Sequence, residues 1–212
     1  MQTKKRVFLV FLFVFLVWTF YRATFFLPEW FEELILKPII FLGPIFFLVK
    51  KEKNALASIG LSIKNLFANI YLGLGLGVLF ALLGVLTKYW KYGGVSFATF
   101  GLTGASLLWL MLLSFITAFS EEVLFRGYIF TRLSKAWKNE WSGGIVSAFL
   151  FSLIHLPIAI FVWHYKPSML FSHGFLSFFL GLTKNIMISK HDMNVAPIIN
   201  HTLWSLTIFL FR

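Results

Sequence analysis

The sequence predicts an all-α, polytopic membrane protein, a transmembrane helix bundle of about seven spans. The chain of 212 residues is 59% hydrophobic and 20% aromatic. Its mean hydropathy of +0.84 exceeds what a surface in contact with water accommodates. Its apolar residues also fall into runs of about 20, the length that a helix needs to cross a hydrocarbon core of about 30 Å. Helices are expected because backbone groups in hydrocarbon must be hydrogen-bonded within their own segment.

The individual spans follow from this length criterion. The first follows the basic stretch "MQTKKR" as in a signal peptide, but its apolar run is too long and no small-residue cleavage site follows, so we expect a retained anchor. The second is short and contains Lys37, so we expect it to be tilted or partly interfacial. The glycines of "YLGLGLGVLFALLG" in the third predict a face for close helix packing. The expected spans are residues 7–27, 34–49, 66–86, 103–124, 143–163, 168–188 and 194–211.

The basic residues predict the orientation. A net charge of +11 could indicate nucleic-acid binding, but Lys and Arg lie in short clusters between apolar runs, as topology signals do, so we expect no nucleic-acid partner. With a cytoplasmic N-terminus, thirteen basic residues lie on the inner side and four on the outer side. We therefore expect a multi-pass protein of the cell membrane with its N-terminus in the cytoplasm. The inner set is Lys4, Lys5, Arg6, Lys50, Lys51, Lys53, Lys64, Arg126, Arg132, Lys135, Lys138, Lys184 and Lys190, and the outer set is Lys88, Lys91, Lys166 and Arg212.

Ionisable side chains inside the spans mark a candidate site, because each is costly to insert into a membrane. A hairpin turn is expected near Lys138, which lies 17 residues after Glu121 and 17 residues before His155. Two antiparallel helices that leave this turn carry both side chains to the same depth. His201, about 10 residues beyond the "SKHDM" loop, is expected within one or two helical turns of that depth. The candidates are Glu121, Glu122, Arg126, His155, His173 and His201.

Helical spacing separates the two adjacent glutamates, because neighbouring residues point about 100° apart. Glu122 and Arg126 stand at i and i+4 with the acid first, the favourable order for an ion pair. We therefore expect this pair to be structural support. Glu121 is expected to have no counter-ion and to be able to act as a base toward water.

Two more pairs share a helix face at the same spacing: Phe151 with His155, and His201 with Ser205. Two histidines at the depth of an unpaired glutamate indicate a site, and we expect Phe151 to pack beneath it. His173 has no such partner and is interpreted as structural or substrate-facing. His164 and His191, at span ends, are interpreted as interfacial.

Three motifs occur in a fixed order. "EEVLFRG" fits Glu-Glu-x-x-x-Arg, "FSLIH" fits Phe-x-x-x-His, and "APIINHTLWS" is centred on a histidine. With these motifs the sequence resembles the CAAX protease and bacteriocin-processing family of intramembrane endopeptidases, which includes the CAAX prenyl endopeptidase and bacterial immunity-type proteins. The resemblance covers residues 100–212, the motif-bearing half of a chain that is expected to form one membrane-embedded domain over residues 1–212.

The resemblance implies roles for these residues. In that family the first glutamate and the second-motif histidine activate the attacking water, which implies Glu121 and His155. The third-motif histidine, with an Asn or Asp four residues later, helps to form the oxyanion site. His201 matches this histidine, but Ser205 stands where the Asn or Asp is expected. A hydroxyl still donates one hydrogen bond, whereas the loss of an amide donor can cost ~10² to 10³ in rate.

Other classes of hydrolase require residues or motifs whose presence can be checked in the sequence. Cysteine is absent, which excludes cysteine nucleophiles and thiolate metal sites. Asp192 is the only aspartate, which excludes an aspartyl dyad, and neither His-Glu-x-x-His nor Gly-x-Ser-Gly occurs. Zinc held by one Glu and two His stays open. We expect no cofactor, because these residues come from three helices without a local His pair, and a glutamate that acts as the base cannot also be a simple ligand.

The sequence therefore predicts an intramembrane glutamate endopeptidase that cleaves a membrane-associated or lipidated protein or peptide. Two alternatives stay open. A non-catalytic member of the same family would be a membrane immunity or scaffold protein, and Ser205 favours this alternative. Buried Glu and His residues also form proton relays in transporters, but the spans have no visible inverted repeat.

Overall fold

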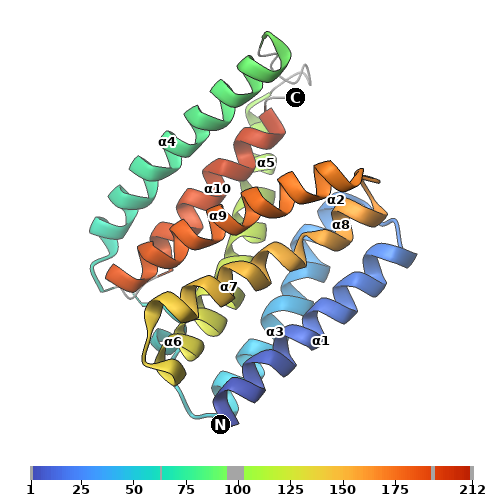
Figure 1. Cartoon of the computed structure of the whole chain (residues 1–212). Coiled ribbons are helices and arrows are strands. Elements are labelled where there is room, and N and C mark those ends of the chain that lie inside the picture. The colour runs from blue at the N-terminus through green and yellow to red at the C-terminus, as the bar shows by residue number, and fades with distance from the viewer. Residues whose placement is uncertain (1, 63, 95–102, 192–193, 211–212) are drawn as a thin grey trace.

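The computed structural model describes residues 2–62, 64–94, 103–191 and 194–210. Every regular element in these ranges is helical (Figure 1), as the all-α prediction requires. The elements are α1 (Gln2–Thr24), α2 (Glu29–Phe31), η1 (Glu32–Leu36), α3 (Lys37–Lys51), η2 (Leu56–Ile59), α4 (Leu66–Tyr92), α5 (Gly104–Glu122), η3 (Val123–Phe130), α6 (Thr131–Trp137), α7 (Glu140–Ile154), α8 (Leu156–Phe161), α9 (Pro167–His191) and α10 (Val195–Leu210).

Each of the seven expected spans overlaps with helix in the described part of the chain. Within the described ranges, four helical stretches are long and apolar enough to cross a membrane: Thr3–Thr24, Leu66–Leu86, Gly104–Trp137 and Glu140–Phe161. The other three spans correspond to α3, α9 and α10. α3 continues the helix of α2 and η1, and none of these three spans meets the same criterion of length and apolar character within the described residues.

The helices pack around α5 and its continuation η3. α10 packs against both α4 and α5, and α9 packs along α7. α1 contacts α3, α6 and α8. In Figure 1, α7 and α9 lie side by side between α4 on one side and α1 on the other. The apolar core joins α1, α3, η3 and α7, and includes Val14, Phe41, Phe125 and Phe151.

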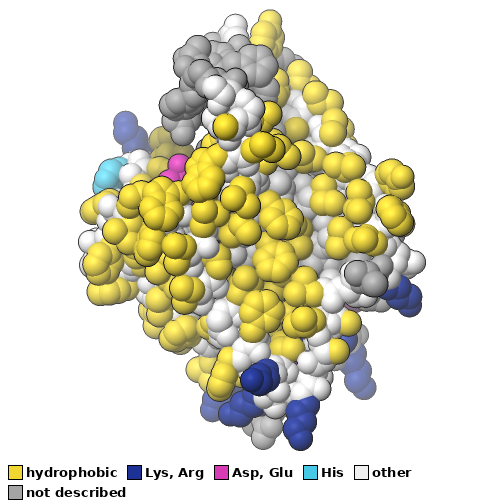
Figure 2. All heavy atoms as spheres, turned by 180° about the vertical axis from the view of Figure 1, so that it is seen from behind, with side chains coloured by type: hydrophobic (Ala, Val, Ile, Leu, Met, Phe, Trp, Pro, Cys, Tyr) yellow, Lys and Arg dark blue, Asp and Glu magenta, His cyan; other side chains and the backbone are white. Residues whose placement is uncertain are grey.

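The surface has the pattern of a membrane protein. Figure 2 shows hydrophobic side chains over most of the face in view, and most of the Lys and Arg side chains in that view gather at the end where the N-terminus lies. Large apolar side chains are exposed on most of the long helices, for example Phe13 on α1 and Phe175 on α9. In water such a surface would drive aggregation, whereas lipid chains can cover it.

The turn between α6 and α7 lies where the sequence predicts it. Lys138 adopts a left-handed conformation (φ 53°) directly after α6. The Asn139 side chain then accepts a hydrogen bond from the Ser142 amide at 3.0 Å, which caps the start of α7. The helices that leave this turn carry Glu121 and His155 back to one common cavity.

The fifth expected span is interrupted at its candidate histidine. α7 ends at Ile154 and α8 starts at Leu156, so His155 lies at the break. Pro157 explains the interruption, because proline has no backbone N–H and its ring crowds the carbonyl group four residues earlier. The backbone N–H of His155 instead bonds to the Ser152 carbonyl at 3.2 Å.

Among the described residues, two segments are wound as π-helix, and each adjoins a pair of glutamates. η1 begins with Glu32 and Glu33 and continues into α3. η3 directly follows Glu121 and Glu122 and continues into α6. π-helical turns are rare and occur frequently at functional sites. Both glutamate pairs therefore lie where the backbone departs from regular α-helix.

The predicted glycine face of α4 packs onto α10. A Cβ atom on Gly73 would lie 2.9 Å from the Ala196 carbonyl oxygen, and a Cβ atom on Gly77 would lie 2.5 Å from Leu203 Cδ1. A Cβ atom on Gly75 would meet nothing within 4 Å. Only one face of the helix therefore needs glycine, because there the two backbones approach closely.

Replacing Gly73 by Leu is expected to separate α4 from α10 and to lower the free energy of unfolding by about 1–3 kcal/mol or more, because the interface has no room for the side chain. Gly75→Leu is the matched control. It is expected to leave stability unchanged or improved, since the side chain enters open space and Leu favours helix more than Gly does. Thermal unfolding of both purified variants in detergent measures the difference. Equal losses would contradict the packing role of the glycine face.

Candidate active site

A cavity of about 220 Å³ lies among α1, α3, α5, α7, α8, α9 and α10. Its wall is partly apolar, with Trp18, Phe41 and Ile208 among the lining residues. The sequence-predicted candidates that line it are Phe151, Glu121, His155, His173, His201 and Ser205. Further polar lining comes from Arg22, Lys37, Thr117, Ser177 and Lys184. The structure therefore brings polar residues from distant parts of the sequence to one largely apolar cavity.

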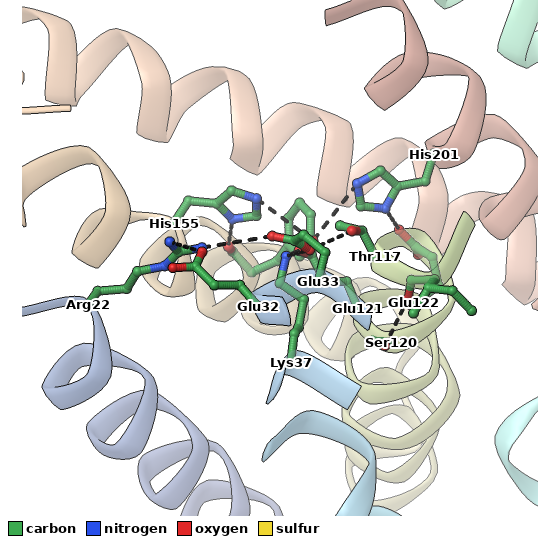
Figure 3. A network of polar contacts seen from close by, with 12 residues as sticks. Arg22, Glu32, Glu33, Lys37, Thr117, Ser120, Glu121, Glu122, His155 and His201 are labelled. Atoms are coloured by element: carbon green, nitrogen blue, oxygen red, sulfur yellow. Dashed lines mark hydrogen bonds and ion pairs between the residues drawn. The ribbon is translucent and has the colours of Figure 1, made fainter. Parts of the chain in front are cut away.

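Glu121 faces both histidines (Figure 3). His155 Nε2 and His201 Nε2 each lie 3.8 Å from Glu121 Oε2. This oxygen is buried and has no direct hydrogen-bond partner among the described residues. A separation of 3.8 Å is too long for a direct hydrogen bond, but one water can bond to both atoms at about 2.8 Å. The arrangement is therefore suited to holding a water molecule against the carboxylate.

Each imidazole ring is oriented through its other nitrogen. His155 Nδ1 lies 2.8 Å from the Phe151 carbonyl oxygen, and His201 Nδ1 lies 2.6 Å from Glu122 Oε1. A carbonyl oxygen and an ionised carboxylate only accept hydrogen bonds, so Nδ1 is the donor in both rings. In a neutral ring Nε2 is then an acceptor, and both Nε2 atoms are directed at Glu121.

Glu122 is a fully buried centre of charge. Arg126 Nε lies 3.1 Å from Glu122 Oε2, as the spacing of the two residues predicts. Lys184 Nζ lies 3.1 Å from Glu122 Oε1, which also accepts the hydrogen bond from His201. Glu122 therefore joins η3, α9 and α10 and fixes the position of one imidazole. The contacts to Lys184 and His201 could not be predicted from local spacing.

Two basic residues are wrongly assigned in the orientation prediction. Arg126 and Lys184 do not lie at the inner surface, because both are buried beside Glu122. Eleven of the thirteen basic residues remain in the predicted inner set. Of the predicted outer set, the side chains of Lys88, Lys91 and Arg212 lie outside the part of the chain that the structure describes.

Phe151 forms the apolar floor that the sequence predicts beneath the site. Its ring centre lies 4.6 Å from that of His155 and 6.1 Å from that of His201. The guanidinium group of Arg126 lies over the same ring at 4.1 Å, a cation–π contact that stabilises a buried charge. A Cβ atom on Gly181 would approach both Arg126 Nη2 and Phe151 to 3.2 Å. This glycine therefore lets α9 approach the floor closely.

The prediction that Glu121 has no counter-ion is wrong. Lys37 Nζ lies 3.2 Å from Glu121 Oε1 and donates a hydrogen bond to it. Lys37 is not interfacial but buried, in the first turn of α3, and it also pairs with Glu33 Oε2 at 2.5 Å. The partners are 84 residues apart, so no helical spacing connects them.

A second group of buried charges continues from Lys37 toward α1 (Figure 3). Glu33 accepts a hydrogen bond from Thr117 and lies 3.8 Å from Arg22 Nη2. Arg22 also forms an ion pair with Glu32, which accepts a further hydrogen bond from the Tyr21 hydroxyl at 2.6 Å. This group was not predicted from the sequence. A signal for it is present, because "EELILK" at residues 32–37 repeats the spacing of "EEVLFR" at residues 121–126.

The remaining candidates differ in their surroundings. Ser205 is half-buried and lines the cavity. His173 also lines it, with its ring centre 5.8 Å from that of His155 and 5.4 Å from that of Trp163. His164 is exposed, with a left-handed backbone (φ 50°), as an interfacial residue can be. The side chain of His191 lies outside the described residues.

Residues 103–207, about half of the chain, match a family model described as type II CAAX prenyl endopeptidase Rce1-like. The chain belongs to the CAAX protease family. Searches of curated proteins and of solved structures found no match. Together with the four helices able to span a membrane, this family identifies the chain as an integral membrane protein. The matched segment contains Glu121 and Ser205, whereas Lys37 lies outside it.

The donor set at this cavity does not fit a zinc ion. Glu121 and the two imidazoles are ligand types that catalytic zinc accepts. However, the Lys37 ammonium already neutralises Glu121 Oε1, so a divalent ion on this carboxylate would face an adjacent buried positive charge. Within the described part of the chain, no group of three His, Asp or Glu side chains could hold a metal ion.

Glu122→Gln is expected to destabilise the protein more than Glu121→Gln does. The first change leaves Arg126 and Lys184 as buried cations without a carboxylate, whereas Glu33 still neutralises the ammonium released by the second change. Breaking a buried ion pair costs about 3–5 kcal/mol, which we expect for Glu122→Gln. Thermal unfolding in detergent compares the two isosteric variants. A larger loss for Glu121→Gln would contradict the central role of Glu122.

Proposed function

We propose that the chain is an intramembrane glutamate endopeptidase that hydrolyses a peptide bond of a membrane-associated or lipidated protein or peptide. The observation that best supports this proposal is the convergence of His155 Nε2 and His201 Nε2 on Glu121 Oε2, each at 3.8 Å. A carboxylate and imidazoles at one cavity are the groups that general acid–base hydrolysis needs. Membership of a protease family supports the same conclusion.

Glu121 serves as the general base. A water bonded to its Oε2 and to His155 Nε2 is oriented from both sides, and Glu121 takes one proton as the water oxygen attacks the scissile carbonyl carbon. The new C–O bond moves the carbonyl electron pair onto oxygen. Glu121 then delivers its proton to the amide nitrogen and the C–N bond breaks. The products are a carboxylic acid and an amine, and the carboxylate of Glu121 is regenerated.

His201 and Ser205 are the proposed stabilisers of the oxyanion. Because Nδ1 of His201 donates to Glu122, Nε2 can donate to the oxyanion only when the ring carries a second proton. The Ser205 hydroxyl, which lines the same cavity, supplies another donor. Glu122 and Arg126 hold this arrangement in shape, and Phe151 packs beneath it.

We place the N-terminus in the cytoplasm and the protein in the cell membrane. This assignment is supported by the gathering of Lys and Arg side chains at the N-terminal end of the molecule (Figure 2). The partners of the site are then the lipid bilayer and a membrane-associated protein or peptide substrate. Nucleic acid is not an expected partner, since the basic residues flank an apolar belt.

A second candidate function is that of a non-catalytic immunity or scaffold protein. Ser205 favours it, because a hydroxyl stands where the family pattern has an Asn or Asp. Asn200 is not expected to replace that donor, since it does not line the cavity. Asn194 does not replace it either, because its amide donates to the Ile59 carbonyl at 2.8 Å.

Glu121→Gln is expected to lower peptide hydrolysis by about 10²- to 10⁴-fold, because it removes the base while keeping the shape of the side chain. We would compare the membrane proteomes of cells that carry the wild type with those of cells that carry this variant. The wild type is expected to generate new protein C-termini that the variant does not, and these termini identify the substrate.

His155→Gln and His164→Gln provide the matched histidine controls for the same comparison. The first is expected to reduce cleavage and the second is not, because His164 is exposed outside the cavity. Identical C-termini in wild-type and Glu121→Gln cells, at equal expression, would contradict the enzyme proposal and favour the non-catalytic one.

Hydrolysis is expected to continue in the presence of a strong chelator, because the proposed water activation uses Glu121 and His155 without a metal ion. Cleavage of an identified substrate by the purified protein would be measured before and after prolonged chelation, together with the zinc content of the protein. Loss of cleavage that zinc alone restores would overturn the metal-free mechanism.

A further inference from the structure

We infer that Lys37 is a positioning residue of the hydrolytic site: a fixed counter-ion, supplied by the N-terminal half, that orients Glu121 and keeps it ionised. The inference rests on the proposed role of Glu121 as the base. It assigns a function to a segment that lies outside the family match, which covers residues 103–207.

The two carboxylate oxygens of Glu121 have separate partners. Oε1 accepts a hydrogen bond from Lys37 Nζ at 3.2 Å. Oε2 has no direct hydrogen-bond partner among the described residues and lies 3.8 Å from His155 Nε2 and His201 Nε2. The ammonium group therefore holds one oxygen and leaves the other turned toward the imidazoles, which is the orientation that the proposed water activation needs.

Lys37 is itself held in place. Its ammonium group lies 2.5 Å from Glu33 Oε2, one helical turn earlier, and 5.5 Å from the centre of the Trp18 ring. Glu33 in turn accepts a hydrogen bond from Thr117, which lies four residues before Glu121 on α5. Two adjacent links therefore join the η1–α3 segment to α5, one from Glu33 to Thr117 and one from Lys37 to Glu121.

Burial makes this ammonium group important to the carboxylate. An ionised carboxylate that is removed from water without a partner becomes protonated instead, and a protonated acid cannot act as a base. Within the described ranges, Lys37 is the Lys or Arg that lies within 4.0 Å of Glu121. The nearby cations Arg126 and Lys184 are both paired with Glu122. The two histidines facing Oε2 present Nε2 as an acceptor when neutral.

The repeated Glu-Glu-x-x-x-basic spacing of residues 32–37 and 121–126 supports a common design for the two segments. In each, the second glutamate pairs with the basic residue four positions later: Glu33 with Lys37, and Glu122 with Arg126. Each adjoins a π-helical segment. Lys37 differs in forming a second ion pair with the other segment, through Glu121.

The first experiment compares Lys37→Met with Lys37→Arg, using the purified protein and an internally quenched peptide with a farnesylated cysteine fourth from its C-terminus. Lys37→Met is expected to lower kcat by about 10²-fold, because Glu121 loses the contact that orients it. KM is expected to stay nearly unchanged, because the rest of the cavity lining is unaltered. Lys37→Arg keeps the charge and is expected to retain most of kcat. Equal activity in the two variants would overturn the inference.

A chemical rescue distinguishes the effect of the positive charge at position 37 from the effect of side-chain size. The chain has no cysteine, so Lys37→Cys introduces a unique thiol. Modification with 2-aminoethyl methanethiosulfonate restores an ammonium group, whereas propyl methanethiosulfonate adds a neutral group of similar size. The first adduct is expected to recover at least tenfold in kcat, and equal recovery with both would overturn the inference. Intact mass reports the extent of modification, and if neither reagent reaches the thiol, the Met and Arg variants decide alone.

Glu32→Gln is the structural control. It breaks the same group of buried charges at Arg22 and Tyr21 without touching Lys37 or Glu121. It is expected to lower the Tm while kcat stays near the wild-type value. If it lowers kcat as much as Lys37→Met does, Lys37 acts only through general stability and the inference fails.

A spectroscopic measurement tests Lys37 independently of catalysis. The infrared difference between wild type and Glu121→Gln at neutral pH is expected to contain the bands of an ionised carboxylate. In the Lys37→Met background, the same difference is expected to contain the carbonyl band of a protonated carboxyl group. An unchanged carboxylate spectrum would overturn the inference even for an active enzyme. No cleavage of the peptide by the wild type would instead count against the proposed function, with the spectra still deciding the role of Lys37.

Discussion

The structure depends on balancing charge where water cannot solvate it. Buried ions in a membrane are stable only when they are paired and hydrogen-bonded. The acidic and basic side chains described around the cavity match in number, so with neutral imidazoles the group carries no net charge. Its acidic members are Glu32, Glu33, Glu121 and Glu122, and its basic members are Arg22, Lys37, Arg126 and Lys184.

The same ion pairs hold the helices together and form the candidate site. Most of the pairs join different helices: Lys37 on α3 reaches Glu121 on α5, and Lys184 on α9 reaches Glu122. His201 on α10 bridges the two glutamates. A helix that left the bundle would leave an unpaired charge in lipid, which is costly, so the packing of the bundle holds the side chains at the cavity in place.

Sequence reasoning succeeded where the information was local. The helical segments, the turn at Lys138 and the ion pair of Glu122 with Arg126 all depend on neighbours in one helix or one hairpin, and the structure has each of them. Of the seven predicted spans, four are long and apolar enough to cross a membrane within the described residues. It failed where a contact depends on packing between helices that are distant in the sequence. The pair of Lys37 with Glu121 spans 84 residues, and the π-helical winding of η3 has no signature in the apolar pattern. The helix break at His155 was not predicted, but it was predictable in principle, because Pro157 is its cause.

The continuous helical stretch Gly104–Trp137 has a consequence for how the protein sits in a bilayer. Its 34 residues extend roughly 50 Å at about 1.5 Å per residue, well beyond a hydrocarbon thickness of about 30 Å. Such a hydrophobic mismatch is relieved by tilting or by projecting one end into the headgroup layer. Arg132 and Lys135 occupy its C-terminal end, so that end is the one suited to contact phosphates. Glu121 lies near the middle of this helical stretch, away from the end that carries Arg132 and Lys135.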